Sequence, residues 1–304
     1  MHKTAGRVVA LFAASLIFVF SLRAQAGTTT LDLESANWSI SARPNLAAKP
    51  PPKQVIQDFL TRLYPRWAGL YNPSEYDSFA FADLRQSGTL SLVAALAPGG
   101  PGGCGATIIA DKEGQKFEWA WIQCMGSPIK IGGKTVVVSG KQISAYRGAA
   151  SCPTEFPVIY GWNGSAYVDM SSQFPSYYRK KLDYLQPYLA SYPGSPHYAR
   201  GPLPCAAIIE AAAIDQYLGI SPDGAIEDAA IRWSQSKNTA DKEMAIDLLG
   251  SIGTQRARDY LTAMTSDSDP EVAKAAEGTL TTLNAGAHED SLANVGHLKV
   301  DTGP

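Results

Sequence analysis

The sequence predicts an α+β fold in which an antiparallel β-rich domain is followed by a small all-helical module. Between about residues 76 and 170, short apolar and β-branched stretches alternate with glycine and proline, which is typical of antiparallel strands. From about residue 176 onward, apolar residues recur at helical spacing instead. Three of the four cysteines lie in the first part and Cys205 begins the helix predicted at 205–218, so we expect disulfides to staple the β-rich domain.

The first residues carry the pattern of a secretory signal peptide. Lys3 and Arg7 precede an apolar run of 15 residues at 8–22, and Ala24-Gln25-Ala26 follows. The run is shorter than the ~20 residues that a membrane span needs. We therefore predict a signal peptide over residues 1–26, a periplasmic or secreted chain, and no stable membrane span after cleavage. An uncleaved N-terminal anchor is the alternative.

The charge balance argues against one class of partner. The chain has a formal net charge of −2. Cleavage after residue 26 would remove three positive charges and no negative ones, which leaves −5. Nucleic-acid-binding proteins present basic surfaces, so we expect no nucleic-acid partner.

The cysteines allow three pairings, and one of them has a geometric argument. Residues 104–110 and 117–124 read as the two strands of a hairpin around a loop at 111–116. If residues whose numbers sum to 228 face each other, Cys104 lies opposite Cys124 and Ile108 opposite Ala120. Facing Cβ atoms are close enough for a disulfide after slight closure. Cys152 then pairs with Cys205, unless some of the cysteines are merely buried.

Further strands are expected at residues 78–82, 89–96, 135–139, 157–160 and 166–169. The last two flank Asn163-Gly164, a strong hairpin signal because both turn residues accept positive φ. Helices are expected at residues 54–63, 174–192 with an interruption at Pro187, 205–218, 225–234, 240–252, 255–264 and 270–283. Asp269 followed by Pro270 and Glu271 is a clear helix start.

These expectations divide the chain into five parts. They are the signal peptide at 1–26, a polar and proline-rich linker at 27–53, a disulfide-stapled β-rich domain with flanking helices at 54–204, a helical module at 205–284, and a disordered tail at 285–304.

The helical module contains a weak internal repeat. The segment 241–245, Asp-Lys-Glu-Met-Ala, recurs as Asp-Pro-Glu-Val-Ala at 269–273, and Gly250 corresponds to Gly278. With Ala275-Ala276, these words resemble the short HEAT-like helical repeats of phycobilisome-lyase relatives, over about residues 225–283. The resemblance implies a protein-binding or scaffolding surface. Barely two units are present and solenoids need three or more, so we expect the helices to pack on the β-rich domain or on the helix at 205–218.

A second, fainter resemblance lies at residues 81–90. This stretch is similar to the strand–loop–strand element of FG-GAP repeats, whose loop carries calcium-binding acids. Here Arg85, Gln86 and Ser87 replace most of those acids and only Asp83 remains. We therefore expect no calcium.

Other catalytic and metal motifs are weak. The histidines after residue 26, at 197, 288 and 297, have no ligand partners at metal-binding spacing, so we expect no metal, cofactor or catalytic residue. Residues 127–130 match Ser-x-x-Lys and residues 132–135 resemble a phosphate loop, but both lie beside predicted strands rather than helices. No spacing brings together any two of the acids Asp77, Asp83, Glu118, Glu155 and Asp169.

Tyrosine is the least ordinary feature, because eight of the 14 fall between residues 160 and 198. In the helix at 174–192, Tyr177, Lys181, Tyr184 and Tyr188 form one stripe, and a leucine stripe of Tyr178, Leu182, Leu185 and Leu189 lies about 100° away. The leucines are expected in the core. The tyrosine stripe is either an exposed recognition strip for a protein or sugar, or part of one wide buried face, which we favour.

Together these patterns predict an exported, non-catalytic binding or scaffold protein. Its partner would be a protein or glycan of the cell envelope, bound through Tyr177, Lys181, Tyr184 and Tyr188. The alternative is a hydrolase of an envelope polymer with an acid/base site on its loops. A pair of titratable residues in a cleft would favour the hydrolase, and an exposed aromatic patch would favour binding.

Overall fold

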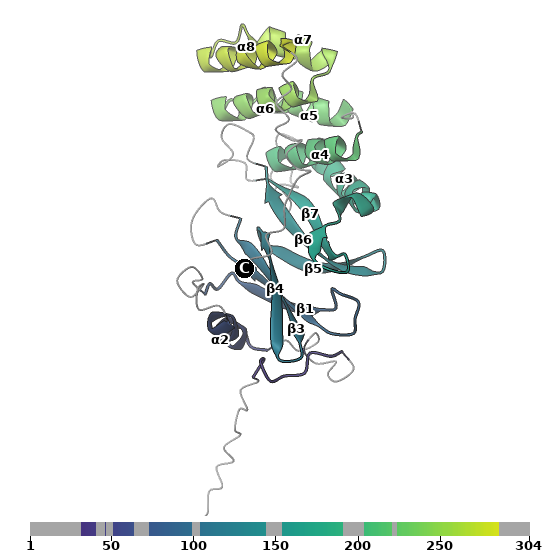
Figure 1. Ribbon diagram of the computed structural model, residues 1–304. Helices are drawn as coiled ribbons and strands as arrows, with labels where there is room; N and C mark the ends of the chain where they lie inside the picture. Colours follow the sequence, from purple (N-terminus) through teal and green to yellow (C-terminus); the bar gives the residue numbers. More distant parts are fainter. Residues whose placement is uncertain are drawn as a thin grey trace, which may run out of the picture. The chain divides into compact units, whose positions relative to one another are not determined.

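The structure is a computed structural model, and it describes residues 32–40, 46, 51–63, 73–98, 104–143, 154–190, 204–220 and 224–285. The described residues belong to one compact unit, Asp32–Pro304. The predicted signal peptide and residues 286–304 of the predicted tail lie outside them. Within the described residues the α+β prediction is confirmed, because two antiparallel sheets precede a run of helices (Figure 1).

The first sheet has the strand order β1-β2-β3-β4, and all neighbours are antiparallel. The strands are β1 (Ser78–Ala82), β2 (Ser91–Leu96), β3 (Ala106–Glu113) and β4 (Lys116–Gln123). Every residue of β2 is buried, as expected for an apolar run in the middle of a covered sheet. The helix α2 (Lys53–Leu63) contacts β1.

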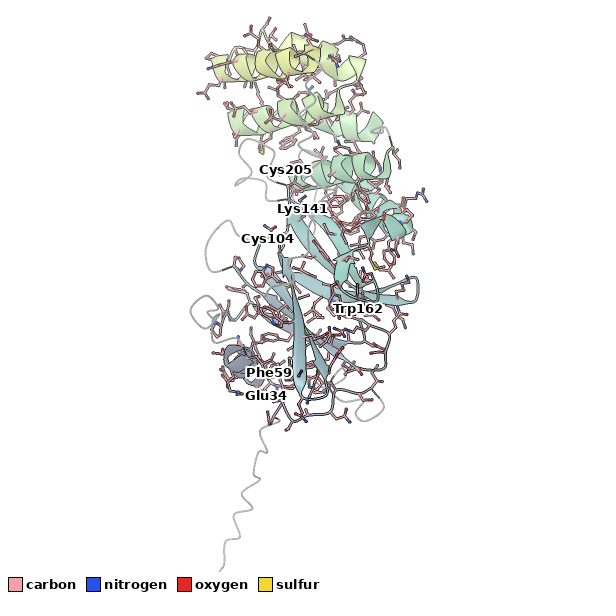
Figure 2. The ribbon with its side chains drawn as sticks, in the orientation of Figure 1. Glu34, Phe59, Cys104, Lys141, Trp162 and Cys205 are labelled. Atoms are coloured by element: carbon pink, nitrogen blue, oxygen red, sulfur yellow. A yellow bond between two sulfur atoms is a disulfide. The ribbon has the colours of Figure 1, made fainter. Side chains whose placement is uncertain are left out.

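An aromatic cluster seals this sheet beneath α2. Trp38 lies 5.3 Å from Phe81 of β1, 5.5 Å from Phe117 of β4 and 6.1 Å from Phe59 of α2, between ring centroids. Figure 2 labels Phe59 among these side chains. Residues 32–40, which fall within the predicted linker, thus contribute a buried tryptophan to the core.

The second sheet has the order β5-β6-β7-β8 and is also antiparallel. It consists of β5 (Gly126–Ile131), β6 (Lys134–Gln142), β7 (Glu155–Trp162) and β8 (Tyr167–Asp169). The β7–β8 hairpin confirms the Asn-Gly prediction. Asn163 closes the turn because its side-chain oxygen accepts hydrogen bonds from the backbone N–H groups of Ser165 and Ala166.

Strand β5 was not predicted from the sequence. Pro128 lies within it, and proline usually argues against a strand because it lacks an N–H donor. Here β5 is the edge of the sheet, where one side of the strand needs no donor. Gly132 and Gly133, both with positive φ, form its turn into β6, so the phosphate-loop reading of this segment is excluded.

The cysteine hairpin has the predicted disulfide but a different register. Cys104 and Cys124 are bonded, with Cα atoms 4.6 Å apart. The residue numbers of facing pairs in β3 and β4 sum to 229 rather than 228. Ile108 therefore faces Trp121, and the predicted pairing with Ala120 is wrong by one residue. The bond forms nevertheless because Gly105 and Cys124 both adopt positive φ and turn the chain at the end of the ladder. Cys205 is also disulfide-bonded, and its predicted partner Cys152 lies outside the described residues.

The helices begin and end close to their predicted positions. After the 3₁₀ turn η1 (Ser171–Gln173), they are α3 (Pro175–Ala190), α4 (Pro204–Leu218), α5 (Gly224–Ser234), α6 (Thr239–Ile252), α7 (Gln255–Met264) and α8 (Pro270–Asn284). Asp269 caps α8 through the backbone N–H of Glu271, as predicted. The interruption predicted at Pro187 is wrong, because α3 continues past it, with Leu185 and Leu189 buried on either side.

One hydrophobic core joins the sheets to the helices. It includes Val93 and Ile109 of the first sheet, Ile159 of the second, Leu185 of α3 and Ile214 of α4, and it continues to α8. Helix α4 packs on β7, and α5 packs on α3 and α4. The hairpins α5–α6 and α7–α8 then stack, with α5 against α7 and α6 against α8 (Figure 1).

Candidate functional site

A cleft of about 470 Å³ lies between the second sheet and the helices α3 and α4. Helical spacing places Tyr177 and Lys181 of α3 one turn apart on one face, and Ala206 and Glu210 of α4 likewise. Because strand residues alternate between faces, Glu155 and Pro157 of β7 point to the same side. The cleft volume falls within the 300–1,000 Å³ range that is usual for ligand sites.

The walls of the cleft are partly apolar. Met125, Val138, Pro157 and Ala206 contribute apolar surface, and Tyr177 contributes its ring. Met125 directly follows the disulfide at Cys124. The Ser139 hydroxyl, also part of the cleft lining, donates to the carbonyls of Gln123 and Cys124. The disulfide therefore fixes the wall that Met125 forms.

Three charged side chains meet in the cleft. The Lys181 ammonium lies 3.1 Å from a carboxylate oxygen of Glu210, which is buried. Burial raises the pKa of Glu210, the charge of Lys181 opposes this shift, and the charge of Glu155 adds to it. The two glutamates therefore act on one another electrostatically.

Glu155 differs from Glu210 because it lacks a cation. It is exposed to solvent, and among the described residues it makes no hydrogen bond or ion pair. The surrounding walls nevertheless raise the pKa of its carboxyl group by burial. Within the part of the chain that the structure describes, the cleft thus holds one paired carboxylate, Glu210, and one unpaired carboxylate, Glu155.

Gly140 makes room for the Glu155 side chain. A Cβ atom at position 140 would lie 1.8 Å from a carboxylate oxygen and 2.8 Å from the Cβ of Glu155. Any larger residue would have to displace this carboxylate, so the absence of a side chain at Gly140 sets the position of Glu155.

The predicted tyrosine strip, Tyr177, Lys181, Tyr184 and Tyr188, leads out of this cleft along α3. Tyr184 is 50% exposed, whereas Tyr177 and Tyr188 are half-buried and pack against the core. The wide buried face that we favour therefore holds for Tyr177 and Tyr188 but not for Tyr184. The Tyr184 and Tyr188 rings lie 5.5 Å apart, and the Lys181 ammonium lies 5.4 Å from the Tyr184 ring. The predicted core stripe of α3 is confirmed for Tyr178, Leu185 and Leu189, which are buried.

A second aromatic group holds α3 and α4 in place around the cleft. Tyr178 stacks on Phe156 of β7 at 5.5 Å, and its hydroxyl donates to the carbonyl of Pro157 at 2.8 Å. Tyr217 of α4 contacts both rings. The three rings join α3, α4 and β7, which are the elements that carry the cleft.

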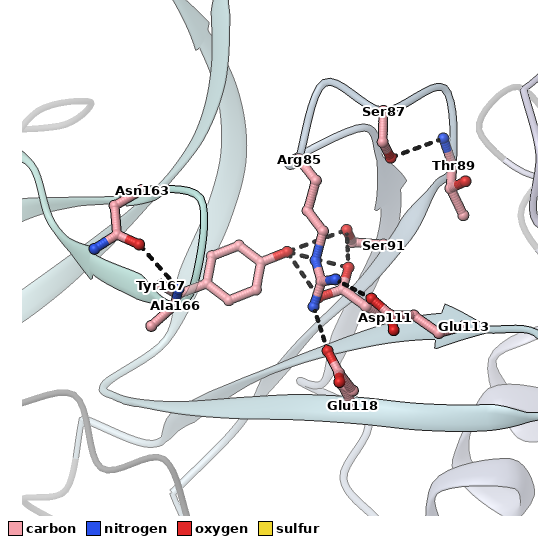
Figure 3. Close-up of polar contacts among 10 residues, drawn as sticks. All are labelled: Arg85, Ser87, Thr89, Ser91, Asp111, Glu113, Glu118, Asn163, Ala166 and Tyr167. Carbon is pink, nitrogen blue, oxygen red and sulfur yellow. Dashed lines mark hydrogen bonds and ion pairs between the residues drawn. The ribbon is translucent and has the colours of Figure 1, made fainter.

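A buried polar network between the two sheets is the other notable cluster (Figure 3). Arg85 pairs with Asp111 at 2.9 Å, Glu113 at 2.6 Å and Glu118 at 3.0 Å. Its guanidinium lies 3.9 Å from the Trp162 ring centre of β7. The Trp162 side chain is also labelled in Figure 2.

Asp111 is the centre of this network. It accepts hydrogen bonds from Ser91 of β2 and from the Tyr167 hydroxyl of β8, the latter at 2.9 Å. Burial raises the pKa of Asp111, although the Ser91 hydrogen bond and the charge of Arg85 act in the opposite direction. Arg85 is shared by three carboxylates, of which Glu113 and Glu118 are more than half exposed and Asp111 is buried. The contacts of Asp111 with Arg85 and Tyr167 tie the two sheets together.

The remaining predicted motifs have structural roles. Asp83 accepts hydrogen bonds from the backbone N–H groups of Ser87 and Gly88, so its own loop uses the carboxylate that FG-GAP repeats give to calcium. Asp77 accepts from Ser74 and Ala97 in the same way. Ser127 and Lys130 lie on strand β5, where a spacing of three places them on opposite faces.

The histidines considered as ligands lie outside the described residues. Within the residues that the structure describes, no three His, Cys, Asp or Glu side chains are grouped to hold a metal ion. Of the five acids considered in the sequence, Glu155 lies in the cleft together with a second acid, Glu210. No pattern in the sequence pointed to Glu210. Glu210 lies in an alanine-rich helix that reads only as core.

No described helix is long and apolar enough to cross a membrane. Comparisons of the chain with protein families, with curated proteins and with solved structures found no match. The site must therefore be interpreted from its own geometry.

Proposed function

We propose that this chain is an exported, non-catalytic binding protein whose site is the cleft and the tyrosine strip beside it. One observation carries the proposal: the tyrosine strip, with Tyr184 exposed and Tyr177 and Tyr188 half-buried, adjoins a partly apolar cleft of about 470 Å³. Tyrosine is favoured at interfaces because its ring supplies rigid apolar contact and its hydroxyl a polar one. The partner would be a protein or glycan of the cell envelope.

Export is supported by two features of different kinds. The sequence pattern at residues 1–26 is that of a signal peptide. The disulfide between Cys104 and Cys124 is of the type that persists in oxidising compartments. We place the protein in the periplasm or among secreted proteins on this basis.

The helices α5 to α8 provide a second surface for scaffolding. Their stacking, α5 against α7 and α6 against α8, is compatible with the HEAT-like resemblance. Repeats of this kind commonly bind other proteins, so we propose a scaffolding role for this stack.

A hydrolase is the second candidate, and one observation favours it. Glu155 and Glu210 share the cleft, and burial raises the pKa of both. Glycosidases use two carboxyl groups, one of which acts as a general acid with a raised pKa. The pairing of Glu210 with Lys181 favours binding over this chemistry, because an ion-paired carboxylate is a poor proton donor.

The test compares binding by three forms of the protein. Immobilised wild type, Tyr184→Ala and Tyr76→Ala are each incubated with an envelope extract, and the captured proteins and glycans are quantified. Tyr76 is the matched control because it is an exposed tyrosine, at 73%, that lies before β1 and not on α3. We expect Tyr184→Ala to lose at least about tenfold of the captured partner, as for truncation of an interface aromatic, and Tyr76→Ala to lose none.

Equal capture by all three forms would refute the binding site. Cleavage of an envelope polymer that disappears in both Glu155→Gln and Glu210→Gln would favour the hydrolase instead.

A further inference from the structure

Among the described residues, the charges that line the cleft do not balance. The lining contains two carboxylates, Glu155 and Glu210, and among the described residues one cation, Lys181. Lys181 is 3.1 Å from Glu210, so the unpaired negative charge resides on Glu155. A single positive group on a ligand would neutralise the cleft.

The surroundings of Glu155 indicate what should carry that charge. Met125, Val138 and Pro157 give the cleft an apolar wall, and Tyr177 adds an aromatic ring. A flexible alkyl chain packs well on such a surface while its charged end reaches a carboxylate. A Tyr ring also attracts a cation placed over its face.

Other ligand charges fit less well. An anion would meet a net negative site. A metal ion needs several oxygen ligands, and the described residues form no group of three or more His, Cys, Asp or Glu that would hold one. The volume of about 470 Å³ also exceeds what a bare ion requires.

We propose that the cleft receives a lysine side chain of a protein partner, with its ammonium group on Glu155 and its alkyl chain along the apolar wall. The exposed Tyr184 and the half-buried Tyr188 would then contact the part of the partner that lies beside that lysine, along α3. This inference rests on the proposed binding function, because it specifies the ligand of the same site. Gly140 has a defined part, since its missing side chain leaves the space that the carboxylate occupies.

The experiment follows the methyl signal of Met125, which belongs to the cleft wall. The chain has five methionines, so labelling their methyl groups with ¹³C gives few NMR signals, and Met125→Leu assigns the one of interest. The probes are a capped pentapeptide with one lysine between glycines, its norleucine counterpart, 1,5-diaminopentane and a chitin tetrasaccharide. The buried Met170 and Met244 report whether each variant remains folded.

We expect the lysine peptide to shift the Met125 signal and to bind at least about tenfold more tightly than the norleucine peptide, because one ion pair separates the two. Glu155→Gln should remove that advantage and leave norleucine binding unchanged. Glu277→Gln, which changes an exposed carboxylate on α8, should change neither.

Several results would overturn the inference. They are an absent Met125 shift with the lysine peptide, equal affinity for both peptides, or no effect of Glu155→Gln. Tighter binding of the diamine would assign the cleft to a free amine rather than to a protein lysine. If only the sugar binds, and Tyr184→Ala abolishes that binding, the lysine proposal is refuted and the proposed binding function stands. If Tyr184→Ala captures the envelope partner as wild type does, the proposed binding function itself is refuted.

Discussion

At the scale of single residues, the structure separates acids that stabilise the fold from one that does not. Asp83 and Asp77 close loops through backbone N–H groups, and Asp111 anchors Arg85. Glu155 has no such partner among the described residues, and burial acts against its charge. Groups that work against stability often mark functional sites, which agrees with a ligand role for Glu155.

The pKa of Glu155 predicts how stability depends on pH. Because its pKa is raised in the folded state, its favourable contribution is complete below the unfolded pKa and is lost as the pH rises through the folded pKa. Glu155→Gln should therefore raise the melting temperature near neutral pH and change it little at about pH 3.5. Thermal melts of wild type, Glu155→Gln and the control Glu277→Gln across this range test the sign. A lower melting temperature for Glu155→Gln at neutral pH would contradict it.

The ion pair between Arg85 and the buried Asp111 predicts that substituting Arg85 lowers the stability of the fold strongly. Removal of Arg85 leaves Asp111, whose side chain is 7% exposed, without a cation. Arg85→Met should cost about 3–5 kcal/mol of unfolding free energy, as for a broken buried ion pair. Denaturant unfolding measures this cost.

The matched control for Arg85 is Arg62→Gln. Arg62 is 55% exposed and pairs with Glu34, so its loss should cost only about 0–1 kcal/mol. Similar costs for the two arginines would show that the network between the sheets does not support the fold.

At the scale of secondary-structure elements, the two glycines of the helical repeat have different roles. A Cβ atom on Gly250 of α6 would lie 2.3 Å from the methyl group of Thr279 on α8, whereas one on Gly278 would meet nothing within 4 Å. The repeat aligns these positions, but only Gly250 lets two helices approach closely.

This difference predicts opposite effects of the same substitution. Gly278→Ala should raise stability by up to about 1 kcal/mol, because alanine favours a helix more than glycine does. Gly250→Ala should lower it by about 1–3 kcal/mol through overpacking. Adding Thr279→Ser should restore most of that loss, since serine lacks the obstructing methyl group. Urea unfolding of the four proteins provides the test, and stabilisation by Gly250→Ala would refute the close approach.

At the scale of the whole molecule, the helices are expected to depend on the rest of the chain. Helix α5 packs on α3 and α4, Trp233 is fully buried, and Arg232 donates to the carbonyl of Leu189 on α3 at 2.7 Å. The prediction that the repeat helices pack on the helix at 205–218 agrees with these contacts. That the helical module does not fold on its own remains a prediction.

Residues 225–304 expressed alone should therefore fail to form a stable stack. The fragment contains a single tryptophan, Trp233, which is fully buried in the full chain. In the fragment this side chain should be exposed to water, so the emission maximum should lie at the longer wavelength of a solvated tryptophan. Its circular dichroism should show a broad thermal transition rather than a cooperative one. A cooperative, fully helical melt would show that the stack is independent.

Local interactions explain the features that were predictable from the amino-acid sequence. The fold class, the helix ends and the β7–β8 hairpin follow from periodicity, capping residues and turn residues, which act over a few positions. The Cys104–Cys124 bond was also predictable, because its two strands are joined by a short turn. Pro128 is an exception. Proline disfavours a strand because it lacks an N–H donor, but an edge strand such as β5 tolerates it, and the edge position is a property of the whole sheet.

The hairpin register and the cleft, in contrast, depend on contacts between segments that are distant in the chain. The register depends on the positive φ of Gly105 and Cys124, and nothing nearby in the sequence requires that of a cysteine. The cleft brings Glu155, Lys181 and Glu210 together from a strand and two helices, and their spacing in the chain carries no signal of this. Whether Tyr184 is buried or exposed was likewise set by which face of α3 packs on the sheet, because periodicity defines stripes on a helix and packing selects the one that is covered.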